Sequence, residues 1–278
     1  MNRSREPAGA LDDLQRYYAA GAEAERLSLG AGQLERARTQ EILARFLPPP
    51  PARVLDVGGG TGVYSLWLLG RGYEVELIDP VPLHVEQATA AFEAAGLPHA
   101  VARLGDARRL DQADGSVDAA LLLGPLYHLT ERADRLAALG EVRRVLRPGG
   151  VLVAAAISRF ASLLDGYARD LVGDPAFVEI VERDLRDGQH RNPTARPDYF
   201  TTAFFHRPRQ LREEVEAAGL IVDALLAVEG PFWIPGGFDA LWADPARRQR
   251  LLEFLRRIET EESLLGVSAH LLVVARKA

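Results

Sequence analysis

The stretch Val54-Leu55-Asp56-Val57-Gly58-Gly59-Gly60-Thr61-Gly62-Val63 decides the fold of this 278-residue chain. Its first four residues have the apolar pattern of a buried β-strand, and the glycines that follow allow a turn whose floor is backbone. Residues 64–70 then form a short apolar helix, so free amide N–H groups face whatever binds at the turn. The stretch predicts a strand, a binding loop and a helix around a small polar cofactor.

The spacing of the glycines separates two kinds of cofactor. A dinucleotide site requires a third glycine where this chain has Val63. Asp56 also stands at the strand end, where its carboxylate would repel a pyrophosphate. Both features favour a cationic ligand over a dinucleotide.

Residues 56–62 resemble motif I of the class I S-adenosylmethionine-dependent methyltransferases, and later segments resemble the remaining motifs of that family. The resemblance runs from about residue 39 to residue 157 and resumes near residue 206. It implies that Asp79 binds the ribose hydroxyls, and that Asp106 and the amide of Ala107 contact the adenine. It implies S-adenosylmethionine as the cofactor, and the residues expected to bind it are Tyr17, Arg26, Asp56, Gly58, Gly59, Gly60, Tyr64, Asp79, Pro80, Gly105, Asp106, Ala107 and Leu123.

Strand and helix patterns alternate along the chain, which indicates βαβ units and a parallel sheet. We expect helices at residues 33–47, 82–95, 131–146 and 208–218, and strands at residues 54–57, 73–79, 101–107, 118–124, 151–153, 220–228 and 270–275. With the family resemblance, the expected fold is α/β: a doubly wound, mostly parallel seven-stranded sheet with an antiparallel last strand.

Two long insertions depart from the minimal pattern, and both are rich in aromatic residues. Together with a helix expected over residues 11–27, they predict a helical and aromatic cap above the sheet. We therefore expect one methyltransferase domain over residues 1–278. Its core takes in about residues 37–157, 207–229 and 267–278, and its cap about residues 11–36, 158–206 and 230–266.

Composition limits the classes of partner and compartment. The net charge of −6 argues against nucleic acid, and the absence of cysteine excludes disulfides and thiolate chemistry. No apolar segment is long enough for a signal peptide or a membrane span, which predicts a cytoplasmic protein without a membrane partner. The six histidines are spread without a ligand cluster, so we expect no metal. The sequence leaves open whether the protein forms a homodimer.

Methyl transfer from a sulfonium depends mainly on alignment, and a general base matters only where the acceptor must lose a proton. The candidates for that base are His128, His206 and Tyr18. His128 follows a strand end and has an ordinary pKa near neutrality, whereas His206 precedes a helix that offers it an equally good packing role. Tyr17 and Tyr18 serve equally well as packing residues of an amphipathic helix. The residues expected to bind the acceptor are Tyr127, His128, Phe205 and Trp233, and the other four histidines are expected to be structural or on the surface.

Three functions share these features, and a fourth is disfavoured by them. The leading hypothesis is methylation of a nitrogen or an oxygen of a small molecule. The alternatives are a protein methyltransferase and a non-catalytic module that binds S-adenosylmethionine, which only a turnover measurement separates from an enzyme. A nicotinamide-dependent oxidoreductase is disfavoured by Val63 and Asp56.

Overall fold

The structure of the protein is a computed structural model, and it describes residues 17–18, 26–194 and 196–278. The helix expected over residues 11–27 lies largely outside these residues. Of that segment only Tyr17, Tyr18, Arg26 and Leu27 are described.

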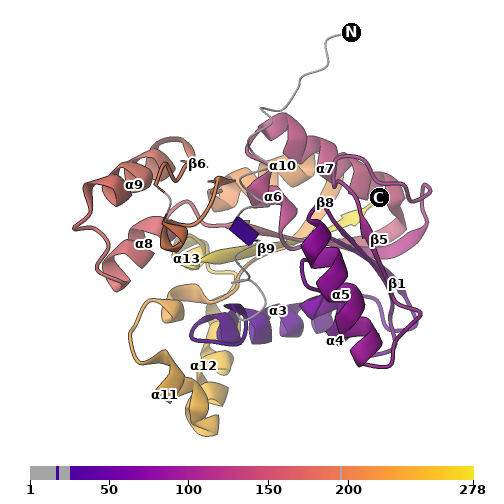
Figure 1. Cartoon of the computed structure of the whole chain (residues 1–278), viewed down its shortest axis with the longest axis horizontal. Coiled ribbons are helices and arrows are strands. Elements are labelled where there is room, and N and C mark those ends of the chain that lie inside the picture. The colour runs from indigo at the N-terminus through magenta and orange to yellow at the C-terminus, as the bar shows by residue number, and fades with distance from the viewer. Residues whose placement is uncertain (1–16, 19–25, 195) are drawn as a thin grey trace.

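One seven-stranded sheet organises the described chain (Figure 1), with the strand order β3-β2-β1-β4-β5-β9-β8. The pairs among the first five strands are parallel, whereas β9 is antiparallel to both of its neighbours. The expected fold is therefore confirmed. The strands are β1 (Arg53–Val57), β2 (Glu74–Asp79), β3 (Val101–Leu104), β4 (Val117–Leu122), β5 (Leu146–Ile157), β8 (Leu220–Ala227) and β9 (His270–Lys277).

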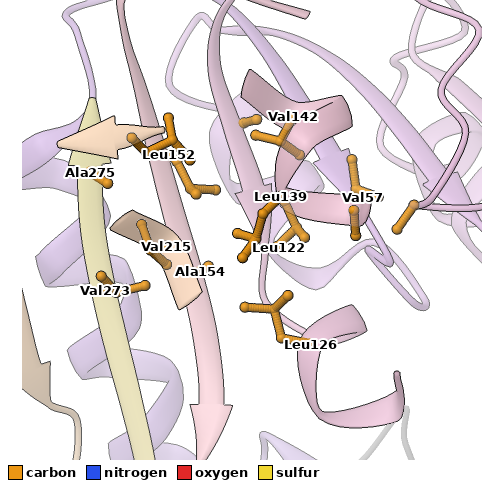
Figure 2. Close-up of a cluster of buried hydrophobic side chains, with 14 of the residues drawn as sticks. Val57, Leu122, Leu126, Leu139, Val142, Leu152, Ala154, Val215, Val273 and Ala275 are labelled. Atoms are coloured by element: carbon orange, nitrogen blue, oxygen red, sulfur yellow. The ribbon is translucent and has the colours of Figure 1, made fainter. Parts of the chain in front are cut away.

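Helices cover both faces of the sheet, as expected for strands that are apolar on both sides. Buried residues of α7 and α10 pack on one face in the cluster that Figure 2 shows, where Leu139, Val142 and Val215 meet Leu122, Leu152 and Val273. Residues of α3 and α4 pack on the other face. The helices of this core are α3 (Gly32–Phe46), α4 (Val63–Leu69), α5 (Pro82–Ala94), α6 (Pro125–His128), α7 (Arg132–Val145) and α10 (Pro208–Ala217).

The two aromatic insertions form additional elements at one side of the sheet (Figure 1). The first packs around a small cluster that includes Phe177 and Tyr199, and the second around Leu251 and Leu255. The first contains α8 (Ala161–Ala168), α9 (Pro175–Asp187), β6 (Gln189–His190), η1 (Pro197–Tyr199) and β7 (Ala203–Phe204). The second contains η2 (Gly230–Trp233), α11 (Phe238–Ala243), α12 (Pro245–Ile258) and α13 (Glu262–Leu265).

One local expectation changes. The sequence predicts a turn at residues 147–150 before the fifth strand, but β5 already begins at Leu146, which pairs with Val117. The next pair joins Ala119 to Val151, so residues 147–150 bulge from the strand, with Gly149 at a φ of +74°. In the described part of the chain, no helix is long and apolar enough to cross a membrane.

Candidate active site

The glycine loop after β1 has the backbone geometry that its sequence requires. Gly58 and Gly60 have φ values of +69° and +58°, which residues other than glycine rarely adopt. A Cβ atom on Gly58 would lie 2.6 Å from Cγ of Pro125. The loop is held to the next strand by a hydrogen bond of 2.6 Å from the Gly58 amide to the carbonyl oxygen of Ile78. The loop therefore passes close to the end of β4.

The loop forms one wall of a cavity at the carboxyl ends of β1, β2, β3 and β4. Binding sites of doubly wound sheets lie at this edge. Of the thirteen residues that the sequence assigns to the cofactor, twelve line this cavity: Arg26, Asp56, Gly58, Gly59, Gly60, Tyr64, Asp79, Pro80, Gly105, Asp106, Ala107 and Leu123.

Asp56 presents a buried carboxylate to the cavity. Its Oδ2 accepts a hydrogen bond of 2.7 Å from Ser65, while its Oδ1 is buried without a partner among the described residues. Burial raises the pKa of Asp56 to about 6, and the nearby Asp79 adds to this rise. A buried acceptor of this kind fits the cationic groups of S-adenosylmethionine.

Asp79, at the end of β2, is held by three donors. Its Oδ1 accepts from the Val81 amide at 2.9 Å and lies 3.0 Å from Nδ1 of His84, and its Oδ2 accepts from the Gly60 amide at 2.9 Å. These contacts fix the carboxylate at the rim of the glycine loop. His84, which sequence reasoning assigned to the structure or the surface, lines the cavity.

Asp106 has a different environment from Asp79. Its carboxylate accepts from the backbone amide of Arg108 at 2.9 Å and from the guanidinium of that residue at 2.6 Å. These contacts with Arg108 outweigh burial and hold the pKa of Asp106 below its usual value, and its side chain is 45% exposed. A contact between Asp106 and an adenine amino group would share this carboxylate with Arg108.

A row of side chains with alternating charge includes three residues that line the cavity, Arg26, Glu35 and His270. Arg26 forms a salt bridge with Glu35, whose carboxylate lies 3.7 Å from Nδ1 of His270. The same nitrogen lies 2.6 Å from Glu229, which also accepts hydrogen bonds from Ser268 and from the His270 amide. Burial opposes a charge on His270, but the two carboxylates prevail and raise the pKa of His270 to about 9.

The ligand atoms of Glu35, Glu229 and His270 lie within 4.8 Å of one another, a spacing that could hold a metal ion. Sequence reasoning compared the histidines only with each other and therefore did not find this group. Since a protonated His270 has no lone pair for a metal and Arg26 already binds Glu35, we interpret this group as an ion-pair network.

His128 lies on the short helix α6, directly beyond β4. Its Nε2 is 2.8 Å from the hydroxyl of Tyr18, and its ring contacts Tyr127. Burial lowers the pKa of His128 to about 4, and a contact with the Thr202 backbone only partly opposes this shift. The expected near-neutral pKa was wrong, because the ring is buried. His128 is therefore neutral at physiological pH and able to accept a proton.

A second cavity adjoins the first and shares four residues with it: Tyr18, Arg26, Tyr127 and His270. Aromatic rings of the first insertion and of η2 form much of its wall, namely Phe177, Tyr199, Phe200, Phe205 and Trp233. Of the four residues expected to bind the acceptor, Tyr127, Phe205 and Trp233 line this cavity, and His128 lines the first.

Two expected site residues do not reach either cavity. His206 is fully buried, with its Nε2 3.2 Å from Glu214, whose carboxylate also binds Arg135 at 2.8 Å. The structure therefore does not support His206 as a base, because its ring serves a buried ion network. Tyr17 packs edge-on against Tyr18 and Phe200 and lines neither cavity.

The sheet order, the glycine loop and the acidic residues at the strand ends define a class I S-adenosylmethionine-dependent methyltransferase. Comparison with known proteins agrees. Residues 54–150 match the family model described as a methyltransferase domain. An uncharacterised methyltransferase of Mycobacterium tuberculosis is 37% identical over 186 residues, which cover 65% of this chain and 69% of that protein. The chain belongs to the S-adenosylmethionine-dependent methyltransferases, and it is an enzyme that uses this cofactor.

Two further comparisons add detail. The demethylmenaquinone methyltransferase of Beutenbergia cavernae is 32% identical over 193 residues, covering 65% of this chain and 75% of that protein. A solved S-adenosylmethionine-dependent methyltransferase from Methanosarcina mazei matches with a TM-score of 0.59 at 19% identity, over 85% of this chain and 96% of that one. At this identity the structure supports the fold alone.

Proposed function

We propose that this enzyme transfers a methyl group from S-adenosylmethionine to a nitrogen or oxygen of a small, largely apolar acceptor. The observation that carries the proposal is the aromatic second cavity, which shares Tyr18, Arg26, Tyr127 and His270 with the first cavity. An acceptor there would meet the cofactor at the shared residues. The similarity to a methyltransferase named for demethylmenaquinone is compatible with an acceptor that has an apolar ring.

The polar atoms of the second cavity support an apolar acceptor. Tyr199 donates its hydroxyl to Asp174 at 2.7 Å, and Trp233 donates its indole N–H to the carbonyl oxygen of Val267 at 2.9 Å. The two ring nitrogens of His190 contact Asp184 and the carbonyl oxygen of Tyr199. Two carboxylates also line the cavity, Asp165 and Asp198, and they form salt bridges with Arg169 and Arg196. Because these polar groups have partners within the protein, the cavity offers mainly aromatic faces.

The residues around the first cavity would hold the cofactor in a fixed direction. Asp79 and the glycine loop mark the ribose end, whereas Asp56 faces the cationic amino-acid end. Arg26 lines both cavities, although it also binds Glu35, so its guanidinium is placed to meet a carboxylate. When bound, S-adenosylmethionine supplies an electrophilic methyl group on a sulfonium.

Tyr18 and His128 are the groups placed to remove a proton from the acceptor. The Tyr18 hydroxyl lies 2.8 Å from Nε2 of His128, at residues where the two cavities meet. The neutral ring of His128 would take the proton of the acceptor as the methyl group is transferred, and Tyr18 would orient that ring. The pair is half-buried, and the aromatic rings around it would limit the access of water to the reacting atoms, which favours direct displacement.

The test is a turnover screen with the full chain, S-adenosylmethionine and a panel of small phenols, hydroxyquinones and amines. Release of S-adenosylhomocysteine in step with a methylated product is the expected result. The panel should include peptides as a comparison. Turnover of peptides without turnover of any small molecule would contradict the proposed acceptor class, and binding of cofactor without any turnover would favour a non-catalytic module.

A further inference from the structure

His84 lies beside the proposed ribose carboxylate with one ring nitrogen in use and one without a partner. Its side chain is 5% exposed, and its Nδ1 is 3.0 Å from Oδ1 of Asp79. Its Nε2 is buried and has no hydrogen-bond partner among the described residues. Buried polar atoms in native proteins usually have partners, so this nitrogen indicates that a ligand supplies one.

The contacts of Asp79 fix the tautomer of the neutral His84 ring. Oδ1 of Asp79 is an acceptor, since it also takes the hydrogen bond of the Val81 amide. Nδ1 of His84 must therefore carry the proton, and in a neutral imidazole the other nitrogen then has the lone pair. In this tautomer Nε2 of His84 is an acceptor, so the partner that it lacks is a hydrogen-bond donor.

The same contacts limit what Asp79 offers the cofactor. A carboxylate has about four lone-pair sites. Three are occupied by Val81, His84 and Gly60, which leaves one on Oδ2. The ribose of S-adenosylmethionine has two hydroxyl groups, so Asp79 as it is held here has room for one of them.

Tyr18 does not supply the missing donor to His84. Its ring packs edge-on against the His84 ring, with the centroids 4.9 Å apart, while its hydroxyl lies 2.8 Å from Nε2 of His128. Tyr18 therefore packs against His84, and of the two cavities His84 lines only the first.

We propose that His84 is a cofactor-binding residue that shares the ribose with Asp79: Oδ2 of Asp79 accepts one hydroxyl, and Nε2 of His84 accepts the other. This inference rests on the proposed ribose role of Asp79. His84 thereby has two tasks, since its Nδ1–H holds the carboxylate and its Nε2 binds the ligand. The arrangement makes recognition of the intact diol depend on two side chains that are five residues apart.

The experiment is calorimetric binding of S-adenosylhomocysteine and of its 2′-deoxy and 3′-deoxy analogues to the full chain. His84→Asn retains an amide near the position of Nδ1, so it keeps a donor for Asp79 and removes the acceptor at Nε2. His84→Gln is the matched variant, because its amide reaches the position of Nε2. For the Asn variant we expect about tenfold weaker binding of S-adenosylhomocysteine, the effect of one lost hydrogen bond, with an unchanged melting temperature.

The analogues identify the hydroxyl. One deoxy analogue should bind the wild type about tenfold more weakly and show no further loss with His84→Asn, whereas the losses for the other should add. The Gln variant should recover part of the affinity. Wild-type affinity of the Asn variant, or additive losses for both analogues, would overturn the inference. A wild type that binds no S-adenosylhomocysteine would instead contradict the proposed cofactor site.

A readout that needs no variant is the ¹⁵N resonance of Nε2 in the labelled wild type. Addition of S-adenosylhomocysteine should shift it as the lone pair gains a donor, while Nδ1 stays protonated. The 2′-deoxy or 3′-deoxy analogue that lacks the bonding hydroxyl should leave it in place. An Nε2 resonance that ignores all three ligands would also overturn the inference.

Discussion

The first cavity, which we assign to the cofactor, and the second, which we assign to the acceptor, are assembled in different ways. We call them the cofactor half and the acceptor half of the site. The cofactor cavity is formed largely by loops that leave neighbouring parallel strands, each within a few residues of its strand end. The acceptor cavity draws on α6, on both insertions and on the segment before β9. The first half is therefore set by backbone geometry near each motif, and the second by packing between segments far apart in the sequence.

The functional consequence is a division of labour. Changes in the cofactor half should alter the affinity for S-adenosylmethionine, whereas changes in the acceptor half should alter turnover or the KM of the acceptor. Tyr18 lines both cavities and touches His84 and His128, so it joins the two halves.

The largest effect is expected at His128. His128→Ala should lower kcat by about 10²–10⁴-fold if His128 takes the proton of the acceptor, with cofactor affinity nearly unchanged. The lowered pKa means that the neutral ring is present above about pH 4 and is lost as the pH falls through that value. The kcat of the wild type should therefore be flat between pH 6 and 8. If the pH profile of kcat rises near pH 6.5 and this rise persists in the His128→Ala variant, the base is a residue other than His128.

His206→Asn is the control for that experiment. It removes a fully buried ring from Glu214 but leaves the bond between Glu214 and Arg135, so it should lower the melting temperature and leave kcat intact. A large loss of kcat in a folded His206 variant would show that a residue outside both cavities contributes to the reaction.

In the cofactor half, Asp79→Asn should weaken binding of S-adenosylhomocysteine at least tenfold, because charge-assisted hydrogen bonds are worth about 1.5–3 kcal/mol each. Asp106→Asn should cost less, since that carboxylate is half exposed and bound to Arg108. Calorimetry on both variants checks the order. Equal losses of affinity in the two variants would mean that the three hydrogen-bond donors around Asp79 do not orient its carboxylate toward the ribose.

Two of the histidines that lie beside carboxylates, His84 and His206, show what the sequence could and could not reveal. His84 lies five residues after Asp79, where β2 ends and α5 begins at Pro82, so its contact with the strand end could have been found from local spacing. His206 meets Glu214 and Arg135, and Arg135 lies on a helix from another part of the chain. No local pattern encodes that meeting.

The difference between local spacing and contacts of distant segments also explains which other features could be predicted from the sequence. The strands, the glycine loop and most cofactor positions follow from short motifs, whose geometry is local. The lowered pKa of His128 follows from its burial, and the network of Glu35, Glu229 and His270 joins α3 to the last two strands. Both depend on how the insertions pack, which neither spacing nor composition specifies.

In the acceptor half, Phe200→Leu should raise the KM of the acceptor by about 3–10-fold, the effect of losing one aromatic contact. The Phe200 ring packs near those of Tyr17, His128 and His190, so the change should leave cofactor affinity unaltered. Initial rates with the acceptor from the turnover screen provide the measurement. A change in cofactor affinity larger than the change in KM would break the proposed division between the two halves.

The smallest effect is expected from the pH dependence of cofactor binding through Asp56. Because its pKa is raised to about 6 before the cofactor binds, the carboxylate is mostly charged at pH 7.5 and about one quarter charged at pH 5.5. If the cationic ligand binds only the charged form, S-adenosylmethionine should bind about fourfold more weakly at pH 5.5 than at pH 7.5, and binding at pH 5.5 should release a proton. Calorimetry in buffers of different ionisation enthalpy measures both quantities. Asp56→Asn should bind more weakly at pH 7.5 and lose the pH dependence in this range. A wild type whose affinity is constant from pH 7.5 to 5.5 would show that Asp56 does not face the cation, and that the cofactor half does not depend on charge at the end of β1.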